Sequence, residues 1–217
     1  MEELEDSGSP VWRFVLERAV HEFNNRVGGI LSVSDAHLSR RIENRELRES
    51  LWLIRDGAKA ASDFVVTMAD LLTADEAGPE MTRLSELREY LVAKLRLFLP
   101  RHIQINTPAG SSDAEVKVNA KQLLFCLLAL LQKELSGEQP PSFLLELSIK
   151  VERSTAWLVY RSTGHTGGVQ AEFCKTVFTK IRPSLRRLEI QENPSEFEVA
   201  MGFPNSPEAR SKMTNQK

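Results

Sequence analysis

The sequence predicts a protein of the α + α/β class, in which an N-terminal pair of antiparallel helices is followed by an α+β sandwich. In the first third of the chain, apolar residues recur every three or four positions, which is the spacing of one helix face. A short polar stretch with Gly and Pro then interrupts this spacing. Beyond it, helical and strand-like segments alternate in the order typical of an α+β sandwich. The 217 residues suffice for two modest domains.

These changes in pattern set the expected domain boundaries. The polar termini, residues 1–9 and 205–217, are expected to be disordered. Residues 10–74 are predicted to form the helical hairpin and residues 84–204 the sandwich, with residues 75–83 as the linker between them.

The charge balance argues against several classes of partner. With 28 basic and 30 acidic residues, the net charge of -2 lacks the clustered positive excess of proteins that bind nucleic acids or anionic membranes. No apolar run approaches the roughly 18 residues of a membrane span. Cys126 and Cys174 lie far apart in apolar stretches, which fits neither a disulfide framework nor paired metal ligands. We therefore expect a cytoplasmic protein that binds another protein or a small ligand.

Two long helices are predicted for the hairpin, one from Pro10 to about Ile42 and one from Arg45 to Leu72, joined by a short polar turn. On the first helix, one apolar stripe comprises Leu16, Val20, Phe23, Val27, Ile30 and Ser34. On the second, a heptad-type seam comprises Leu47, Leu51, Ile54, Ala58, Ala61, Val65, Met68 and Leu72.

Two helices, each roughly 40 Å long at ~1.5 Å per residue, cannot enclose two apolar stripes by themselves. A homodimer, in which two hairpins pair as a four-helix bundle, would bury both stripes. The alternative is that the second domain covers the exposed seam. The length and regularity of the seam favour the dimer.

For the second domain, the patterns predict one mixed sheet with helices on a single face. The expected helices are residues 84–99, 120–135 and 170–181, and the expected strands are residues 102–107, 116–118, 143–151, 156–161, 185–191 and 196–203.

His21 lies inside the first predicted helix. Counting ~100° per residue from the centre of the apolar stripe, His21 points to about 140° and Asn25 to about 180°, so both are expected to face water. An outward imidazole on a rigid helix suits phosphoryl transfer, because its nitrogen can be reached for in-line attack. Glu22 could set the imidazole tautomer, and Asn25 could position a phosphoryl oxygen or a water. An ordinary surface histidine is the alternative.

Gly28 and Gly29 continue this surface, and each costs about 1 kcal/mol relative to Ala inside a helix. Either a partner approaches the backbone closely here, or the glycines let the hairpin pack tightly. A zinc-protease motif is excluded, because Asn25 stands where H-E-x-x-H requires its second histidine.

The stretch from His21 to Leu38, HEFNNRVGGILSVSDAHL, resembles the phospho-acceptor box of sensor histidine kinases, which commonly reads like HELNNPLTAILGYAELL. The resemblance extends to residues 47–72, LRESLWLIRDGAKAASDFVVTMADLL, which are similar to the partner helix of that family's dimerisation domain. One departure is Arg26, where the family often has a proline that bends the helix. The resemblance implies that His21 is the phospho-acceptor.

The second domain resembles the family's ATP-binding domain in layout, but the residues expected to bind ATP differ. Ala129 and Lys133 align with the helix that normally carries the nucleotide- and metal-binding asparagine. The stretch from Ser162 to Thr166 stands where the family has Asp-x-Gly-x-Gly, and residues 177–189 hold no counterpart of G-x-G-L-G. Together these losses remove the positioning and charge neutralisation on which transfer from ATP depends. We expect this chain to bind no cofactor itself, and we expect Mg²⁺ only through a partner receiver domain.

The resemblance therefore implies a histidine phosphotransferase of a two-component phosphorelay. His21 would accept phosphate from the aspartate of one response-regulator receiver domain and pass it to another. A receiver is expected to contact the acceptor surface formed by Phe14, Arg18, Asn24, Asn25, Gly28 and Ser32. One alternative is a non-catalytic, dimeric pseudokinase that docks and regulates a response regulator or kinase. Another is an active kinase with an aberrant ATP site.

Overall fold

The computed structural model describes residues 10–40, 42–100, 102–108, 113–135, 143–163, 171–193 and 196–205. The side chains of residues 10–19, 21 and 22 lie outside this description, as do the predicted disordered residues 1–9 and 206–217. The chain divides into two compact units between Thr73 and Ala74. Asn205, predicted to begin the tail, is instead buried, and its amide Nδ2 donates to the carbonyl of Glu152 at 2.9 Å.

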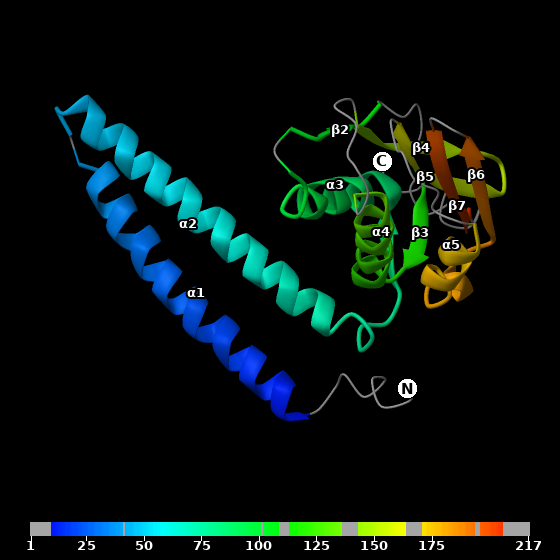
Figure 1. Ribbon diagram of the computed structural model, residues 1–217, viewed down its shortest axis with the longest axis horizontal. Coiled ribbons are helices and arrows are strands. Elements are labelled where there is room, and N and C mark those ends of the chain that lie inside the picture. Colours follow the sequence, from blue (N-terminus) through cyan, green and yellow to red (C-terminus); the bar gives the residue numbers. More distant parts are fainter. Residues whose placement is uncertain are drawn as a thin grey trace, which may run out of the picture. The chain divides into compact units, whose positions relative to one another are not determined.

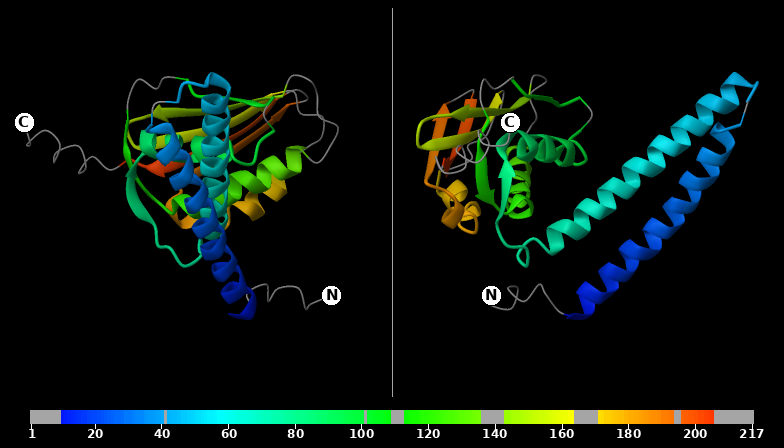
Figure 2. Two further views of the ribbon diagram at one scale, coloured as in Figure 1. Left: turned by 90° about the vertical axis from the view of Figure 1, so that its left-hand side faces the viewer. Right: turned by 180° about the vertical axis from the view of Figure 1, so that it is seen from behind.

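The first unit is a hairpin of two helices, α1 (Pro10–Leu38) and α2 (Arg45–Leu72), which lie side by side in Figures 1 and 2. Asn44 caps α2 by accepting a hydrogen bond from the amide of Leu47 at 3.0 Å. Two contacts between the helices fix their direction: Asn24 with Ser62 and Asp35 with Arg55. As the α1 residue number rises, the α2 number falls, so the helices are antiparallel.

Within its described residues, the hairpin leaves most of its large apolar side chains exposed. Val27 and Ser34 of α1 and Ala58 of α2 are buried. The large apolar side chains that remain exposed on the described part of the hairpin are Phe23, Ile30, Val33, Leu47, Trp52, Leu53, Ile54, Phe64, Val66, Met68 and Leu72. Several of them belong to the predicted stripe and seam. Pairing of α1 with α2 therefore satisfies only part of the apolar pattern.

Six of the exposed apolar residues lie on one side of the hairpin, whereas Trp52 and Val66 of α2 are turned by roughly 80–120° from Ala58 in the opposite sense. Counting ~100° per residue, Phe23, Ile30 and Val33 are turned by roughly 30–110° from the buried direction of α1. On α2, Ile54, Met68 and Leu72 are turned by roughly 40–80° from Ala58 in the same rotational sense. Because the helices run in opposite directions, turning in the same sense brings both sets to the same side. We call this side the apolar face, defined by Phe23, Ile30, Val33, Ile54, Met68 and Leu72.

The second unit contains three α-helices and seven strands within its described residues. In chain order, and with one 3₁₀ turn (η1), the elements are β1 (Glu80–Arg83), α3 (Leu84–Leu95), β2 (Gln104–Asn106), β3 (Glu115–Val118), α4 (Ala120–Leu135), β4 (Leu144–Val151), β5 (Thr155–Thr163), α5 (Ala171–Val177), η1 (Arg182–Ser184), β6 (Arg187–Asn193) and β7 (Glu196–Pro204).

Five of the strands form one sheet in the order β2-β4-β5-β7-β6, in which only β2 and β4 are parallel. Strands β1 and β3 form a separate antiparallel pair. The prediction of a single mixed sheet was therefore wrong for residues 115–118. The segment 75–83, predicted to be a linker, contains β1 and belongs to the second unit. Both differences arise because strand partners are chosen by contacts distant in sequence, which local alternation does not specify.

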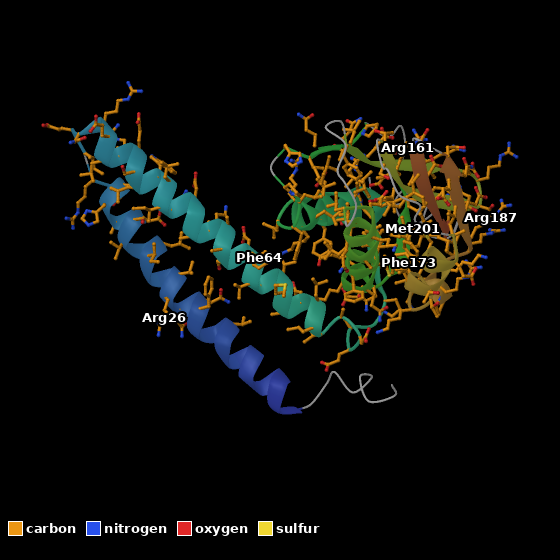
Figure 3. The ribbon with its side chains drawn as sticks, in the orientation of Figure 1. Arg26, Phe64, Arg161, Phe173, Arg187 and Met201 are labelled. Atoms are coloured by element: carbon orange, nitrogen blue, oxygen red, sulfur yellow. The ribbon has the colours of Figure 1, made fainter. Side chains whose placement is uncertain are left out.

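The core of the second unit lies between the helices and one face of the sheet. Along β7, Phe197, Val199, Met201 and Phe203 alternate with less buried residues and are fully buried. Helix α3 contacts β4 and β5. The leucines of α3 and α4 that are likewise inaccessible are Leu84, Leu87, Leu91, Leu95, Leu123, Leu124, Leu127 and Leu130. On the opposite face, Arg161 binds Glu198 at 2.6 Å and Glu196 at 2.9 Å, and Figure 3 labels this arginine. The predicted sandwich is confirmed.

None of the described helices is long and apolar enough to cross a lipid bilayer.

Candidate functional site

The predicted acceptor, His21, lies in the middle of α1. Phe14, Arg18 and Glu22 belong to the same helix. The structure describes the backbone of these four residues as helical, whereas their side chains lie outside the described set. Their placement on α1 follows from the continuous helix Pro10–Leu38, which Ser39 closes by donating its amide to Asp35 at 2.9 Å.

Downstream of His21, α1 presents a polar, small-residue surface. Asn25 and Ser32 are exposed, and Gly28 is half-buried. These residues follow His21 by four, eleven and seven positions, so helical geometry places them on one stripe with it. This stripe is turned by roughly 110–170° from the buried direction of α1, in the sense opposite to the apolar face. The acceptor stripe (His21, Asn25, Gly28 and Ser32) and the apolar face therefore occupy different sides of the hairpin.

Asn24 differs from the expectation that it would belong to the exposed acceptor surface. Its side chain is half-buried, and its Oδ1 accepts a hydrogen bond from the hydroxyl of Ser62 at 3.3 Å. Asn24 thus contributes to the contact between α1 and α2, close to the acceptor stripe. Sequence reasoning missed Ser62, because only the antiparallel pairing brings a residue 38 positions away next to Asn24.

The two glycines of α1 are not required for packing within this chain. A Cβ atom added to Gly28 or Gly29 would meet no other atom within 4 Å. Of the two explanations offered by the sequence, tight packing of the hairpin on itself is therefore excluded. Close approach of a second molecule still accounts for glycines that are unfavourable in a helix interior.

An ion pair and an aromatic contact hold the far end of the hairpin in register. The Arg55 Nε lies 2.6 Å from Asp35 Oδ1, which joins α2 to α1. The same guanidinium lies over the Trp52 ring, 5.0 Å from its centroid. A cation above an indole is favourable by roughly 0.5–1 kcal/mol at exposed sites. The register of the acceptor stripe relative to α2 is therefore fixed by polar contacts on both sides of Gly28.

In the second unit, the position predicted to replace the adenine-binding aspartate is occupied by a buried network. Ser162 is fully buried, and its hydroxyl donates to Glu134 Oε1. The Tyr160 hydroxyl donates to the other carboxylate oxygen of Glu134, Oε2. Glu134 is only 7% exposed, so these two hydroxyls satisfy a carboxylate that would otherwise be costly to bury. The network joins the end of α4 to the centre of the sheet.

Two of the other positions aligned with ATP-binding residues, Ala129 and Lys133, lie on α4. Ala129 on α4 is half-buried, and Lys133 is exposed. Thr166 lies outside the described residues. Glu134 was missed by sequence reasoning, although a single acidic residue near the end of an otherwise apolar helix was a visible signal of a buried polar contact.

The Tyr160 phenol and the thiols of Cys126 and Cys174 are held in their neutral forms. Burial raises the pKa of the Tyr160 phenol well above its usual value, and the Glu134 carboxylate adds to the shift. Burial also raises the pKa of Cys126 to about 12 and that of Cys174 to about 12. Both thiols are therefore protonated and unreactive at neutral pH, as expected for core cysteines.

Within the described residues, no three His, Cys, Asp or Glu side chains are grouped so that they could hold a metal ion.

Comparisons with known proteins find similarity in structure but not in sequence. No protein-family model matches the chain, and no curated protein matches its sequence. Among solved structures, the catalytic domain of histidine kinase ThkA matches 60% of this chain over 99% of its own length, with 9% identity and a TM-score of 0.48. Full-length ShkA in complex with AMPPNP matches 88% of this chain over 46% of its own length, with 15% identity and a TM-score of 0.47.

A histidine kinase from Burkholderia phymatum matches 87% of this chain over 98% of its own length, with 14% identity and a TM-score of 0.45. The chain is thus similar to histidine kinases and to their catalytic domains.

Proposed function

We propose that this chain is a histidine phosphotransfer protein that carries phosphate between the receiver domains of two response regulators. The observation that carries the proposal is the acceptor stripe. A sequence resembling a phospho-acceptor box lies on a long, continuous helix, with exposed Asn25 and Ser32 and a sterically open Gly28 on the same side as His21. A receiver could approach the backbone closely there.

The transfer itself needs little from the protein beyond an accessible imidazole and its positioning. An imidazole nitrogen of His21 attacks the phosphorus of an aspartyl phosphate, and a nitrogen–phosphorus bond forms as the bond to the carboxylate oxygen breaks. The aspartate leaves as a carboxylate. A second receiver reverses these steps, with its own aspartate as the nucleophile. Any Mg²⁺ that neutralises the phosphoryl charge would come with the receiver.

Independence from ATP is supported by the buried network at Ser162. A hydroxyl that is fully buried and donates to Glu134 is not available to the amino group of an adenine. Exposing it would remove the hydroxyl that donates to Glu134 Oε1 inside the core, and leaving a buried acceptor without its donor costs roughly 1–3 kcal/mol. The protein would therefore receive its phosphate from another protein and not from a nucleotide.

A homodimer through the hairpin is part of the proposal. The apolar face has exposed large apolar side chains at helical spacing on both helices, and it lies away from the acceptor stripe. A second copy that pairs through the same face would form a four-helix bundle and leave both acceptor stripes accessible. Such isologous pairing of one patch with itself is the commonest way to form a dimer.

A second candidate is a non-catalytic pseudokinase that docks a receiver without taking phosphate. The open surface at Gly28 and Gly29 favours docking and does not by itself require chemistry at His21. The two candidates share the surface and the dimer, and they differ only in whether the imidazole becomes phosphorylated.

Transfer between two receivers separates the candidates. One receiver is loaded with radioactive phosphate and mixed with the second receiver and the protein. We expect the native protein to move label to the second receiver and His21→Gln to abolish this movement. The matched control is His37→Gln, which changes an exposed histidine in the last turn of the same helix and should leave transfer intact.

Retention of transfer by His21→Gln would contradict the proposal. Receiver binding by the native protein without any transfer would instead establish the docking module. Equilibrium binding of a Mg²⁺–nucleotide analogue at micromolar concentration would show that ATP independence is wrong.

A further inference from the structure

Asn119 makes an unusual set of contacts between distant parts of the second unit. Its side chain is buried, and its Oδ1 accepts hydrogen bonds from the amides of Lys121 and Gln122, each at 3.1 Å. These contacts cap the first turn of α4. Its Nδ2 donates to the carbonyl of Ala74, 45 residues earlier, at 2.9 Å, and to the carbonyl of Ala77. One side chain therefore caps a helix and holds the segment 74–77 against it.

The segment that Asn119 holds begins where the hairpin ends. Helix α2 ends at Leu72, and the amide of Thr73 still donates to the carbonyl of Ala69 at 3.3 Å. The next residue, Ala74, has a buried side chain and a carbonyl held by Asn119. Thr73 is thus held by α2 and Ala74 by the second unit, so very little unconstrained backbone separates the hairpin from the second unit.

We propose that Asn119 is a staple that confines the joint between the two units to the backbone of Thr73 and Ala74. Without it, residues 74–79 would lengthen the joint and widen the range of orientations open to the units. The staple would make the connection short and stiff, which restricts how the hairpin and the second unit can be presented together to a partner. The proposal does not depend on the chemistry of His21, so it can fail or hold independently of the proposed function.

A second set of contacts to the same segment is weaker. Asp75 binds Lys180 Nζ and accepts from Gln122 Nε2 at 3.4 Å, but the Asp75 and Lys180 side chains are both more than half exposed. Exposed ion pairs contribute little, because water competes and the side chains lose entropy. Asn119 is buried and uses all its donors and acceptors, so leaving the Ala74 and Ala77 carbonyls without it is costly.

Asn119→Asp separates the two roles of the residue. An aspartate keeps the acceptor that caps α4, but it cannot donate to the carbonyls of Ala74 and Ala77. Asn119→Ser, which is neutral and also a good cap, controls for the added charge. Lys180→Ala is the matched control, because it removes only the exposed contact to the same segment.

Cleavage by a glutamate-specific protease reports on the segment directly. Glu76 is exposed and lies between the two stapled carbonyls. We expect Asn119→Asp and Asn119→Ser to accelerate cleavage after Glu76 by about tenfold or more, since two hydrogen bonds are lost. Lys180→Ala should change the rate by less than about threefold. Glu43 in the hairpin turn and Glu152 between β4 and β5 are exposed reference sites whose rates should stay unchanged.

Spin-label distances test the joint itself. Labels on Lys59→Cys and Arg187→Cys, diluted with unlabelled protein, report one distance between the units. The native Cys126 and Cys174 would not react, since both are buried and the pKa of each is about 12. We expect a broader distance distribution in the Asn119 variants than in the native chain and in Lys180→Ala.

Two results would overturn the proposal. One is a native distance distribution as broad as that of the Asn119 variants. The other is a parallel rise in cleavage after Glu76 and Glu152, which would make Asn119 a general stability residue of the second unit.

Discussion

The two units of this protein bury their apolar residues to very different extents. The second unit encloses a core in which the inward-facing residues of β7 and the leucines of α3 and α4 are inaccessible to water. Its exposed large apolar residues, among those described, are Met81, Phe125 and Leu144. The hairpin is of similar helical regularity, yet most of the large apolar side chains that the structure describes there remain in contact with water.

The difference shows which unit is complete within one chain. A sheet covered by helices closes a core, whereas two helices have only one contact line between them. Exposed apolar patches of this extent mark sites where another molecule binds. The second unit should therefore be stable as a monomer, and the hairpin should depend on a second copy. Each prediction below tests one side of this contrast.

The largest effect is expected in the core of the second unit. Phe197 is fully buried and meets the Tyr160 ring edge-on at a centroid distance of 6.4 Å. Phe197→Ala should lower the free energy of unfolding by about 3–5 kcal/mol, because it removes buried area and leaves a cavity. Urea unfolding measures the loss. Phe125→Ala, which removes the same side chain from an exposed position on α4, should cost less than about 1 kcal/mol. Equal losses would refute the contrast between core and surface.

A charge on the apolar face should dissociate the dimer. Ile54 is half exposed in the single chain, so Ile54→Glu should hardly change the fold of the hairpin. In the dimer the same change would forfeit about 1.5–3 kcal/mol of apolar burial and would also bury a charge, so association should weaken at least about 100-fold. Sedimentation equilibrium measures the change. Lys59→Glu, on another side of α2, should leave association unchanged. A monomeric native protein would show that the hairpin needs no second copy.

Smaller effects should distinguish the two neighbouring glycines of α1. Gly28→Ala and Gly29→Ala should each raise the free energy of unfolding by about 0.5–1 kcal/mol, because alanine favours the helix and the added Cβ meets no atom within 4 Å. Gly28→Ala should weaken receiver binding more than Gly29→Ala, since Gly28 lies on the acceptor stripe and Gly29 lies beside it. Thermal unfolding and receiver titration measure the two effects. Destabilisation by both substitutions would indicate that the dimer, and not a receiver, requires the glycines.

The smallest effect concerns acid sensitivity of the second unit. Although partial burial opposes ionisation, hydrogen bonds from Ser85 and from the Ala114 amide lower the pKa of Asp113 below 3.8. A carboxyl with a lowered pKa stabilises the fold above its unfolded pKa, and this stability is lost as the pH falls through the folded value. Asp113→Asn should therefore cost less than about 1 kcal/mol at neutral pH. The cost should vanish in strong acid, as measured by urea unfolding at both pH values. If the stability lost in Asp113→Asn were the same at both pH values, the loss would come from packing and not from the charge.

Much of the local structure could be predicted from the sequence. The bounds of α2 and α4 agree with the predicted ranges 45–72 and 120–135, because both helices carry long apolar periodicities and α2 begins at an asparagine cap. Helix α1 ends at Leu38, earlier than the predicted Ile42, since residues 39 and 40 turn back toward α2. The acceptor role of His21 and the homodimer are still predictions.

The sequence by itself determined where most of the helices and strands form, although not β1, because periodicity and caps act over a few residues. Only the tertiary structure decided that β1 pairs with β3, that Asn24 bonds to Ser62, and that Glu134 accepts hydrogen bonds from two hydroxyls of β5. The same holds for Asn119, which reaches 45 residues back to Ala74. Each of these contacts joins residues far apart in the chain, and only folding brings such partners within hydrogen-bonding distance.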